Sequence, residues 1–513
     1  MPQNAEWKIL LVSISGTFMV ILDQTIMNIA LPHIMAVFNE TTDRAQLVIS
    51  AYMMASAITT PAAAFLCIRF GIKRVFILSQ AGFLIGSILC GLAWNTNTLI
   101  LFRVIQGLAG GLLSPIAMTI LFLKIPPQDR GMAMGVFGIP MMLAPAIGPT
   151  LGGYLVDYWD WRWCFYVNVP VVLAAIAIGM AWIEEMPTSM AKFDLLGFTL
   201  AATGFSSLLY ALSYAPSWGW DDLRIIGLMV LGSVSLITWV TMELRSDHPM
   251  LDLRIFKYRG FSLSMGLTFI TTIGLFSAIF LLPVFLQNVR GMSAMNTGLM
   301  LLPTAIGAMI TMPISGRFYD RIGPRLPAVL GLIITALTTL WMQWLDVTTS
   351  DEVLRWMLFL RGMGLGFAMM PIMTYGMASV PQEKTAQASS VMNVWRTVFA
   401  SLGIAIFATL LDQFQKTNLN IMSQTLTPDS VVAMRIISAV QVTLMQSGQT
   451  LESARAVAVN LLYQYVNLQA VITAFQMDFV LAAIVILVGV PPAFLLPFGR
   501  VKKPGAAPGV ELS

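Results

Sequence analysis

Hydrophobic residues occur along the chain in blocks of about 20 or more, separated by short polar clusters. Because a helix rises roughly 1.5 Å per residue, each block can cross a hydrocarbon core ~30 Å thick. Hydropathy along the chain predicts about fourteen such spans, and an even number puts both termini on one side. We therefore expect an all-α polytopic membrane protein. The predicted centres lie near residues 20, 56, 84, 111, 143, 173, 205, 233, 274, 303, 335, 366, 398 and 486.

Composition supports this class over a soluble enzyme. Hydrophobic residues make up 57% of the chain and charged residues 11%, against roughly 25% charged in soluble domains. The apolar run from Ile9 to Leu31 follows no basic segment and is too long for a signal peptide, so we expect a retained first span. Cys67, Cys90 and Cys164 lie in or beside apolar runs, where we expect packed thiols.

Basic residues indicate the orientation. Positive charge accumulates on cytoplasmic loops, and the clusters fall on alternate connections when both termini are cytoplasmic. We therefore expect a multi-pass protein of the plasma (inner) membrane with the lipid bilayer as its surroundings, and nothing in the charge pattern favours nucleic acid. The predicted cytoplasmic clusters are Arg69/Lys73/Arg74, Lys124/Arg130, Arg245/Arg254/Lys257/Arg259, Arg317/Arg321/Arg325 and Arg500/Lys502/Lys503.

An internal repeat divides the chain. "ILFRVIQGLAGGLLSP" followed by "IPPQDRGMAMGV" is repeated as "LFLRGMGLGFAMMP" followed by "SVPQEKTAQASSV". Duplicated halves are typical of transporters, in which two bundles rock about a central site. We expect a six-helix bundle in residues 1–186, an inserted helix pair in 187–258, and a second six-helix bundle in 259–513. A long extracytoplasmic loop, 412–474, has helical apolar spacing, so we expect helical or hairpin structure on the outer face.

Asp23, in "VILDQTIMNIALPHI", is the one carboxylate predicted well inside a span, whereas Asp346, Asp412 and Asp478 fall near outer ends. Burial raises the pKa of a carboxyl group by as much as ~3–5 units, which suits a proton carrier near neutral pH. A sodium site would need several clustered oxygen ligands. The alternative is a structural Asp neutralised by hydrogen bonds from neighbours such as Gln24 and Asn28.

Arg103 is the cation of the fourth span. It stays charged in the membrane and needs partners, so its distance from Asp23 could couple protonation to a conformational change. The alternative is an arginine that only stabilises the fold. Arg361 stands at the corresponding position of the repeat.

Taken together, these motifs resemble those of the fourteen-span drug:H+ antiporters of the major facilitator superfamily, the EmrB/QacA type. The resemblance covers nearly the whole chain and implies two six-helix bundles plus two inserted spans. The similar motifs are "LDQTIMNIALP" in the first span, Arg103, Gln106, Gly107 and Gly111 in the fourth, "GPTLGG" in the fifth and "WRWCFYVNVP" before the sixth.

The resemblance implies roles for two further motifs. In the family, the string that contains Gly148, Pro149, Gly152 and Gly153 marks antiporters, although close helix packing alone would also explain these residues. The cytoplasmic motif is intact as Gly316, Asp320, Arg321, Gly323 and Arg325, a candidate gating loop. Its first copy departs from the pattern, with Ala64 at a glycine position and Ile68 at the aspartate, so Arg69, Lys73 and Arg74 could be ordinary solvated charges.

These residues predict a proton-coupled exporter of small lipophilic or cationic drugs, driven by the proton gradient without a cofactor. The 35 methionines suit an adaptable apolar pocket, and Gln24, Asn28, Gln106, Asn393 and Arg396 are candidate substrate contacts. The chain has no nucleotide-binding P-loop and no histidine pair for a metal. Alternatives are a dedicated exporter of one metabolite, siderophore or lipid, and a non-transporting receptor. A host with two membranes would imply a periplasmic adaptor and an outer-membrane channel.

Overall fold

The computed structural model describes residues 4–185, 188, 194–246, 249–425, 430–447 and 449–499. In these residues the secondary structure is helical, and fourteen segments are long and apolar enough to cross a membrane. This confirms the predicted fold class and number of spans. Positions 186 and 187, where the first expected domain boundary falls, and the basic cluster Arg500/Lys502/Lys503 lie outside the described residues.

The first half contains six spans. They are α1 (Asn4–Phe38), α2 (Thr42–Thr59) continued by η1 (Thr60–Ala62) and α3 (Ala63–Phe70), α4 (Ile72–Gly91), α5 (Thr96–Lys124), α6 (Arg130–Tyr158), and α7 (Trp163–Tyr166) continued by α8 (Asn168–Trp182). The next pair is α9 (Leu195–Trp218) and α10 (Leu223–Arg245), followed by the short η2 (Leu253–Lys257).

The second half repeats this order. Its elements are α11 (Arg259–Val284) continued by η3 (Phe285–Val289), α12 (Ala294–Ile322), α13 (Arg325–Trp341) with η4 (Met342–Trp344), α14 (Asp351–Ala378), η5 (Gln382–Lys384), α15 (Thr385–Thr425), α16 (Val431–Gln446), α17 (Leu451–Val488) and α18 (Val490–Ala493).

Equivalent turns show that the two halves repeat in structure as well as in sequence. Gly71 and Gly323 each adopt a positive φ, 89° and 87°, in the connection before α4 and α13. The next basic residue then donates to a carbonyl near the end of the last helix of its own half. Lys73 Nζ lies 2.7 Å from the Met180 carbonyl oxygen, and Arg325 Nε lies 2.6 Å from that of Leu496.

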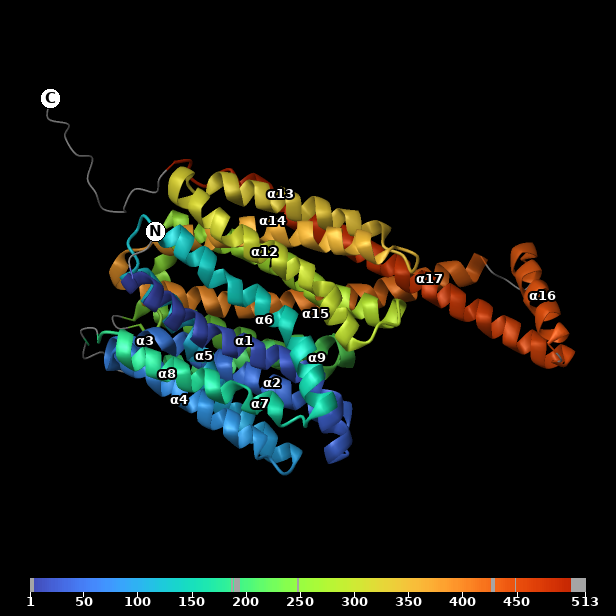
Figure 1. Ribbon diagram of the computed structural model, residues 1–513, viewed down its shortest axis with the longest axis horizontal. Coiled ribbons are helices and arrows are strands. Elements are labelled where there is room, and N and C mark those ends of the chain that lie inside the picture. The colour runs from blue at the N-terminus through green and yellow to red at the C-terminus, as the bar shows by residue number, and fades with distance from the viewer. Residues whose placement is uncertain are drawn as a thin grey trace.

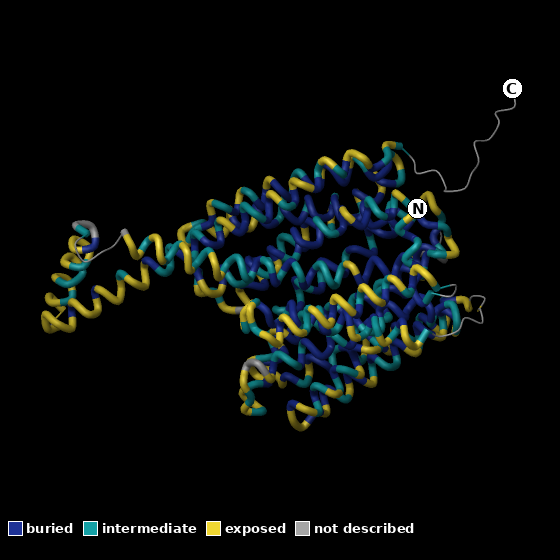
Figure 2. The backbone as a smooth tube through the Cα atoms, turned by 180° about the vertical axis from the view of Figure 1, so that it is seen from behind, coloured by how far each residue is buried: buried dark blue, intermediate teal, exposed yellow. Residues whose placement is uncertain are grey.

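The halves meet along two seams. On one, α6 and α12 pack against each other, and on the other α9 contacts both α2 and α15. Figure 1 shows α12, α13 and α14 on one side of the molecule and α1 to α5 with α8 on the other, with α6 and α15 between them. Buried residues line the inner faces of both halves, while exposed residues follow the outside (Figure 2).

The segment expected as an outer loop is largely helical. Helix α15 continues without a break to Thr425, α16 follows, and α17 begins at Leu451 before it joins the bundle. Together they form an arm that projects from the end of the bundle opposite the N-terminus (Figure 1). The prediction of helical or hairpin structure in this segment is confirmed in its helical form.

The prediction that water can reach Asp478 is wrong. Asp478 and Glu243 are both 0% exposed within helices α17 and α10. Asp478 was expected near an outer end open to water. Because α17 is one continuous helix that packs against α11, α13 and α15, its carboxyl group is enclosed instead.

Candidate proton-coupling site and contacts between the halves

Asp23 lies on α1 at the centre of a buried polar network. Its Oδ2 accepts a hydrogen bond from Arg103 Nη1 at 2.5 Å, and its Oδ1 accepts from Gln106 Nε2 at 2.9 Å and Asn168 Nδ2 at 2.8 Å. Asp23 is 2% exposed and its arginine partner 0%. Ser87 on α4 accepts from both amides. The network around this one carboxylate therefore joins four helices, α1, α4, α5 and α8.

Arg103 is held from several sides. Besides Asp23 it donates to Gln106 Oε1 at 2.8 Å and to the Val48 carbonyl oxygen on α2 at 3.2 Å. Its guanidinium lies over the ring of Tyr52, 4.3 Å from the centroid, which adds a cation–π contact. Its Nη2 has no hydrogen-bond partner among the described residues. The pair predicted as carboxylate and cation of the membrane interior thus lies in direct contact.

The neighbours suggested by sequence spacing do not hold Asp23. Gln24 is half-buried and Asn28 is exposed, and neither donates to the carboxylate in the described structure. Ser87 and Asn168 do take part in the network, and sequence reasoning did not select them. Asn168 lies in the string "WRWCFYVNVP", so its position in a recognised motif was the available signal.

The glycine motif of α6 brings that helix against α1, close to Asp23. A Cβ atom on Gly148 would lie 2.2 Å from Thr25 Oγ1, and one on Gly152 would lie 3.3 Å from the Ile26 carbonyl oxygen. Pro149 faces the other way, 3.2 Å from the Cβ position of Gly298 on α12, while Gly153 has open space around it. The motif thus joins the helix that carries Asp23 to the other half.

The candidate gating loop joins α12 to α6 at the end of the bundle that carries the basic clusters predicted to be cytoplasmic. Asp320 on α12 accepts from the backbone N–H groups of Gly131 at 2.8 Å and Met132 at 2.9 Å, the first turn of α6. A carboxylate is favoured there because the N–H groups of the first turn lack partners in the helix and the helix dipole attracts negative charge. Gly316 allows the approach, since its Cβ would lie 2.1 Å from the Gly131 carbonyl oxygen.

The remaining loop residues act elsewhere. Arg321 is exposed and forms no ion pair with Asp320 in the described structure, whereas Gly323 supplies the positive φ and Arg325 holds the Leu496 carbonyl. On the other seam, where Ile68 replaces the aspartate, the halves are joined by Ser389 Oγ, which donates to the Pro115 carbonyl oxygen at 2.7 Å.

The candidate substrate contacts are scattered. Gln106 is enclosed in the Asp23 network, and Gln24 and Asn28 lie outside it. Arg396 on α15 crosses to the first half, where Nη1 lies 3.1 Å from Met141 Sδ, and its Nη2 lies 3.4 Å from Asn393 Oδ1. These two residues border an apolar cluster shared by both halves, whose methionines include Met118, Met134, Met141, Met142, Met265, Met312, Met369, Met370, Met373, Met377 and Met392.

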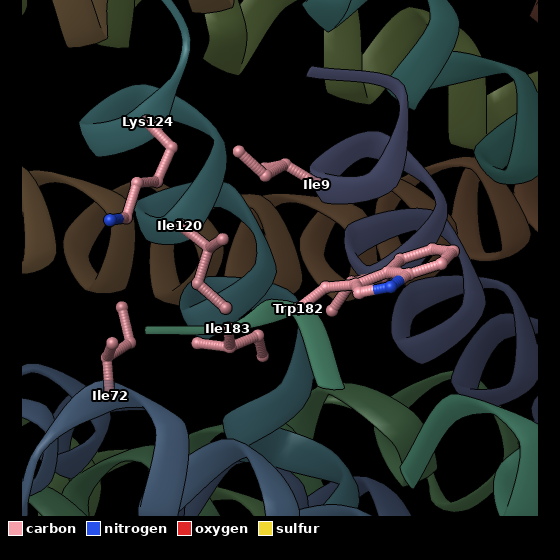
Figure 3. Close-up of a pocket in the computed structure, with 7 residues that line it drawn as sticks. Ile9, Ile72, Ile120, Lys124, Trp182 and Ile183 are labelled. Atoms are coloured by element: carbon pink, nitrogen blue, oxygen red, sulfur yellow. The ribbon is translucent and has the colours of Figure 1, made fainter. Parts of the chain in front are cut away.

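Two recesses lie away from this cluster or at its rim. One, of about 300 Å³, is lined by Ile9, Ile72, Ile120, Trp182 and Ile183 with Lys124 at its edge (Figure 3). Lys124 Nζ pairs with Glu184 Oε2 at 2.5 Å, and this hydrogen bond holds the pKa of Glu184 below its usual value. A second recess, of about 180 Å³, lies between α2, α9 and α15. The residues of the methionine-rich cluster are themselves buried, so the centre is closed in this conformation.

The fold and the buried charge pair define a membrane transporter. The profile described as "Major Facilitator Superfamily" matches residues 14–404. The chain belongs to that superfamily, and relatives named for EmrB and EmrY place it with the EmrB/QacA type.

Three known proteins illustrate the similarity. "Uncharacterized MFS-type transporter YhcA" of Bacillus subtilis is 38% identical over 78% of this chain and 76% of its own length. "Multidrug export protein EmrB" of Escherichia coli is 32% identical over 80% of this chain and 81% of its own length. The crystal structure of the human organic anion transporter MFSD10 (TETRAN) has a TM-score of 0.56 at 15% identity, covering 94% of this chain and 100% of that one, and shows the fold alone.

Replacement of Asp23 by Asn should destabilise the protein by about 3–5 kcal/mol, because it leaves the Arg103 guanidinium buried without its counter-charge. The thermal unfolding midpoint in detergent measures the change. The double variant Asp23→Asn/Arg103→Gln should recover part of the loss. Asp412→Asn, which breaks an exposed ion pair with Lys416, should change stability by about 1 kcal/mol or less. Equal stability of Asp23→Asn and wild type would contradict the importance of the pair.

Replacement of Asp320 by Asn should open the α6–α12 seam, because charge-assisted hydrogen bonds are roughly twice as strong as neutral ones. A cysteine introduced at Met312, which is 0% exposed at this seam, reports opening through its rate of maleimide labelling. We expect a rise of about tenfold, corresponding to ~1.4 kcal/mol. Asp129→Asn is the matched control, since Asp129 precedes the same helix without a side-chain cap bond. Equal rates in both variants would argue against a latch.

Proposed function

We propose that this protein is a proton-coupled exporter of lipophilic, often cationic, compounds from the cytoplasm or inner leaflet, and that it confers multidrug resistance. The observation that carries the proposal is the enclosed ion pair of Asp23 and Arg103. A membrane-buried carboxylate is costly, and such residues mark ion and proton pathways. Two of the relatives bear names that include multidrug export or resistance, which supports efflux as the direction.

In the proposed cycle, the structure corresponds to a state with ionised Asp23. The carboxylate accepts three hydrogen bonds, from Arg103, Gln106 and Asn168, and protonation of either oxygen would remove an acceptor from this set. Arg103 would then need other partners, and the network on four helices would rearrange. Uptake of the proton from outside and its release to the cytoplasm would thereby alternate two arrangements of the first half.

The contacts of α6 provide a route from this site to the other half. Gly148 packs on Thr25, two residues from Asp23, while Pro149 faces Gly298 on α12, and the first turn of α6 binds Asp320. A shift of α1 would therefore move a helix that touches the second half near both ends. We propose that substrate occupies the methionine-rich cluster between the halves, near Asn393 and Arg396, once these contacts part.

The energy of proton entry is sufficient for export. One charge that crosses about 150 mV releases roughly 3.5 kcal/mol, which at ~1.4 kcal/mol per decade sustains a concentration ratio of a few hundred. If a monovalent cation leaves for each proton that enters, the electrical contribution cancels and the pH gradient alone drives export. Neutral and cationic substrates should thus respond differently to membrane potential.

The proposed orientation follows the positive-inside rule. Both termini would lie in the cytoplasm of a plasma-membrane protein, with the Asp320 seam on the inner side and the arm outside. The periplasmic adaptor and outer-membrane channel of a two-membrane host stay predictions. So do the alternatives of a single-metabolite, siderophore or lipid exporter and of a receptor.

Drug-dependent proton flux tests the proposal. Wild type, Asp23→Asn and the control Asp412→Asn are reconstituted into proteoliposomes, a pH gradient is imposed, and lumenal pH is recorded as cationic drugs are added. Wild type and the control should show proton flux upon drug addition, whereas Asp23→Asn should show none, because it cannot bind the proton. Flux that persists in Asp23→Asn would refute its role as carrier. Failure of every drug to elicit flux in wild type would favour the narrow exporter or the receptor.

A further inference from the structure

Asp478 is a buried carboxyl group that the Asp23 network does not use. It lies on α17 and is 0% exposed, and neither of its oxygens has a hydrogen-bond partner among the described residues. Phe475, Phe479 and Ala482, on the same helix, belong to an apolar cluster formed with α11, η3 and η4. Asp478 therefore lies beside this apolar cluster and, among the described residues, lacks the hydrogen-bond donors that surround Asp23.

No cation in the described structure compensates Asp478. The charged groups on or next to the elements packed against α17 are Arg259, Arg290, Arg325, Asp346, Arg396, Asp412, Lys416 and Arg435, and Asp351 and Arg361 lie on α14. Arg290 pairs with Asp351 at 2.9 Å and Lys416 with Asp412 at 2.6 Å. Arg361, the buried arginine of this half, donates to the Gly274 carbonyl oxygen and to Thr339 Oγ1. None of them forms an ion pair with Asp478.

An ionised carboxylate without partners is too costly in an apolar interior, and such a group becomes neutral by binding a proton. A metal cation would require several oxygen ligands, and the described residues contain no group of three or more His, Cys, Asp or Glu side chains that could hold one. We propose that Asp478 is a second proton-binding site, located in the second half and occupied in this closed conformation.

The position of Asp478 indicates the side with which its proton exchanges. Two residues earlier, Gln476 Nε2 donates to the Leu345 carbonyl oxygen at 3.0 Å, in the connection between α13 and α14. That connection lies at the end of the bundle from which the arm projects, the proposed outer side. Asp478 thus takes its proton from the outer face. The proposal that the proton comes from the outer side rests on the proposed orientation and function. The proposal that Asp478 holds a proton does not.

A membrane-permeant carbodiimide detects protonated carboxyl groups in apolar surroundings. The acid adds across one C=N bond, its proton goes to nitrogen, and the acyl group then migrates to nitrogen to form a stable N-acylurea, with no change of oxidation state. The purified wild-type chain in lipid nanodiscs at neutral pH is treated with dicyclohexylcarbodiimide, and modified peptides are quantified by mass spectrometry. Asp23 is the internal control, because it is equally buried but paired with Arg103.

We expect the peptide containing Asp478 to be modified at least about tenfold more than that containing Asp23, because only a neutral carboxyl reacts. The infrared carbonyl band of a protonated carboxyl should also be lost in Asp478→Asn and kept in Asp412→Asn. No modification of Asp478, with this band unchanged in the variant, would overturn the proposal. Because neither readout involves transport, modification of Asp478 in a protein without drug-dependent flux would retain the proton site and refute only the proposed function.

In proteoliposomes, acidification of the outer solution alone tests the direction of exchange. If the band assigned to Asp478 first falls when both sides are made alkaline and then returns on outer acidification, the outer route is supported. Its return only on lumenal acidification, with the arm facing the bath, would overturn that route. Protease cleavage in the arm identifies which side faces the bath.

Discussion

The burial of one guanidinium and one carboxylate constrains the whole first half. Within a bilayer each of these charges would be expensive alone, and desolvation remains costly even for the pair unless hydrogen bonds satisfy the remaining polar atoms. The structure meets this requirement by drawing Ser87, Gln106 and Asn168 to the same point. Apolar side chains alone give little preference for one arrangement of helices in a membrane. The polar network therefore sets the relative positions of α1, α4, α5 and α8.

The duplicated half has kept the scaffold of this centre without its carboxylate. Arg361 corresponds to Arg103 and bonds to Thr339, much as the first-half network bonds to Ser87. Three residues after each arginine, the first half has Gln106 and the second Gly364, whose missing side chain lets α13 approach, since a Cβ there would lie 2.5 Å from Thr335 Oγ1. The two halves thus each bury one arginine at corresponding positions. Arg103 pairs with a carboxylate, whereas Arg361 lies where α14 packs closely against α13.

The spans and the buried ion pair follow from the sequence, whereas several hydrogen-bond partners depend on how the helices pack. The spans and the pairing of Asp23 with Arg103 could be predicted, because long apolar runs and isolated membrane charges permit few alternatives. The position of Asn168 in a recognised motif was an available signal, but its partner could not be predicted, because an asparagine in an apolar run has many potential partners. The partners of Asp320 are backbone N–H groups, which every residue except proline carries and which therefore leave no trace in the sequence. The burial of Asp478 was not predicted, because hydropathy located the span but not the helices that enclose this side chain.

The inserted pair has a consequence for lateral access from the bilayer. Since α9 contacts both α2 and α15, and Trp220 Nε1 in the connection after α9 donates to Thr409 Oγ1 at 2.8 Å, that seam is covered by protein in this conformation. A molecule dissolved in the acyl chains would therefore have to pass between α6 and α12, where Gly131 and Gly316 bring the two backbones together. The inserted helix pair thus leaves one of the two seams between the halves as the lateral route from the bilayer. The glycines of that seam set how closely α6 and α12 can approach each other.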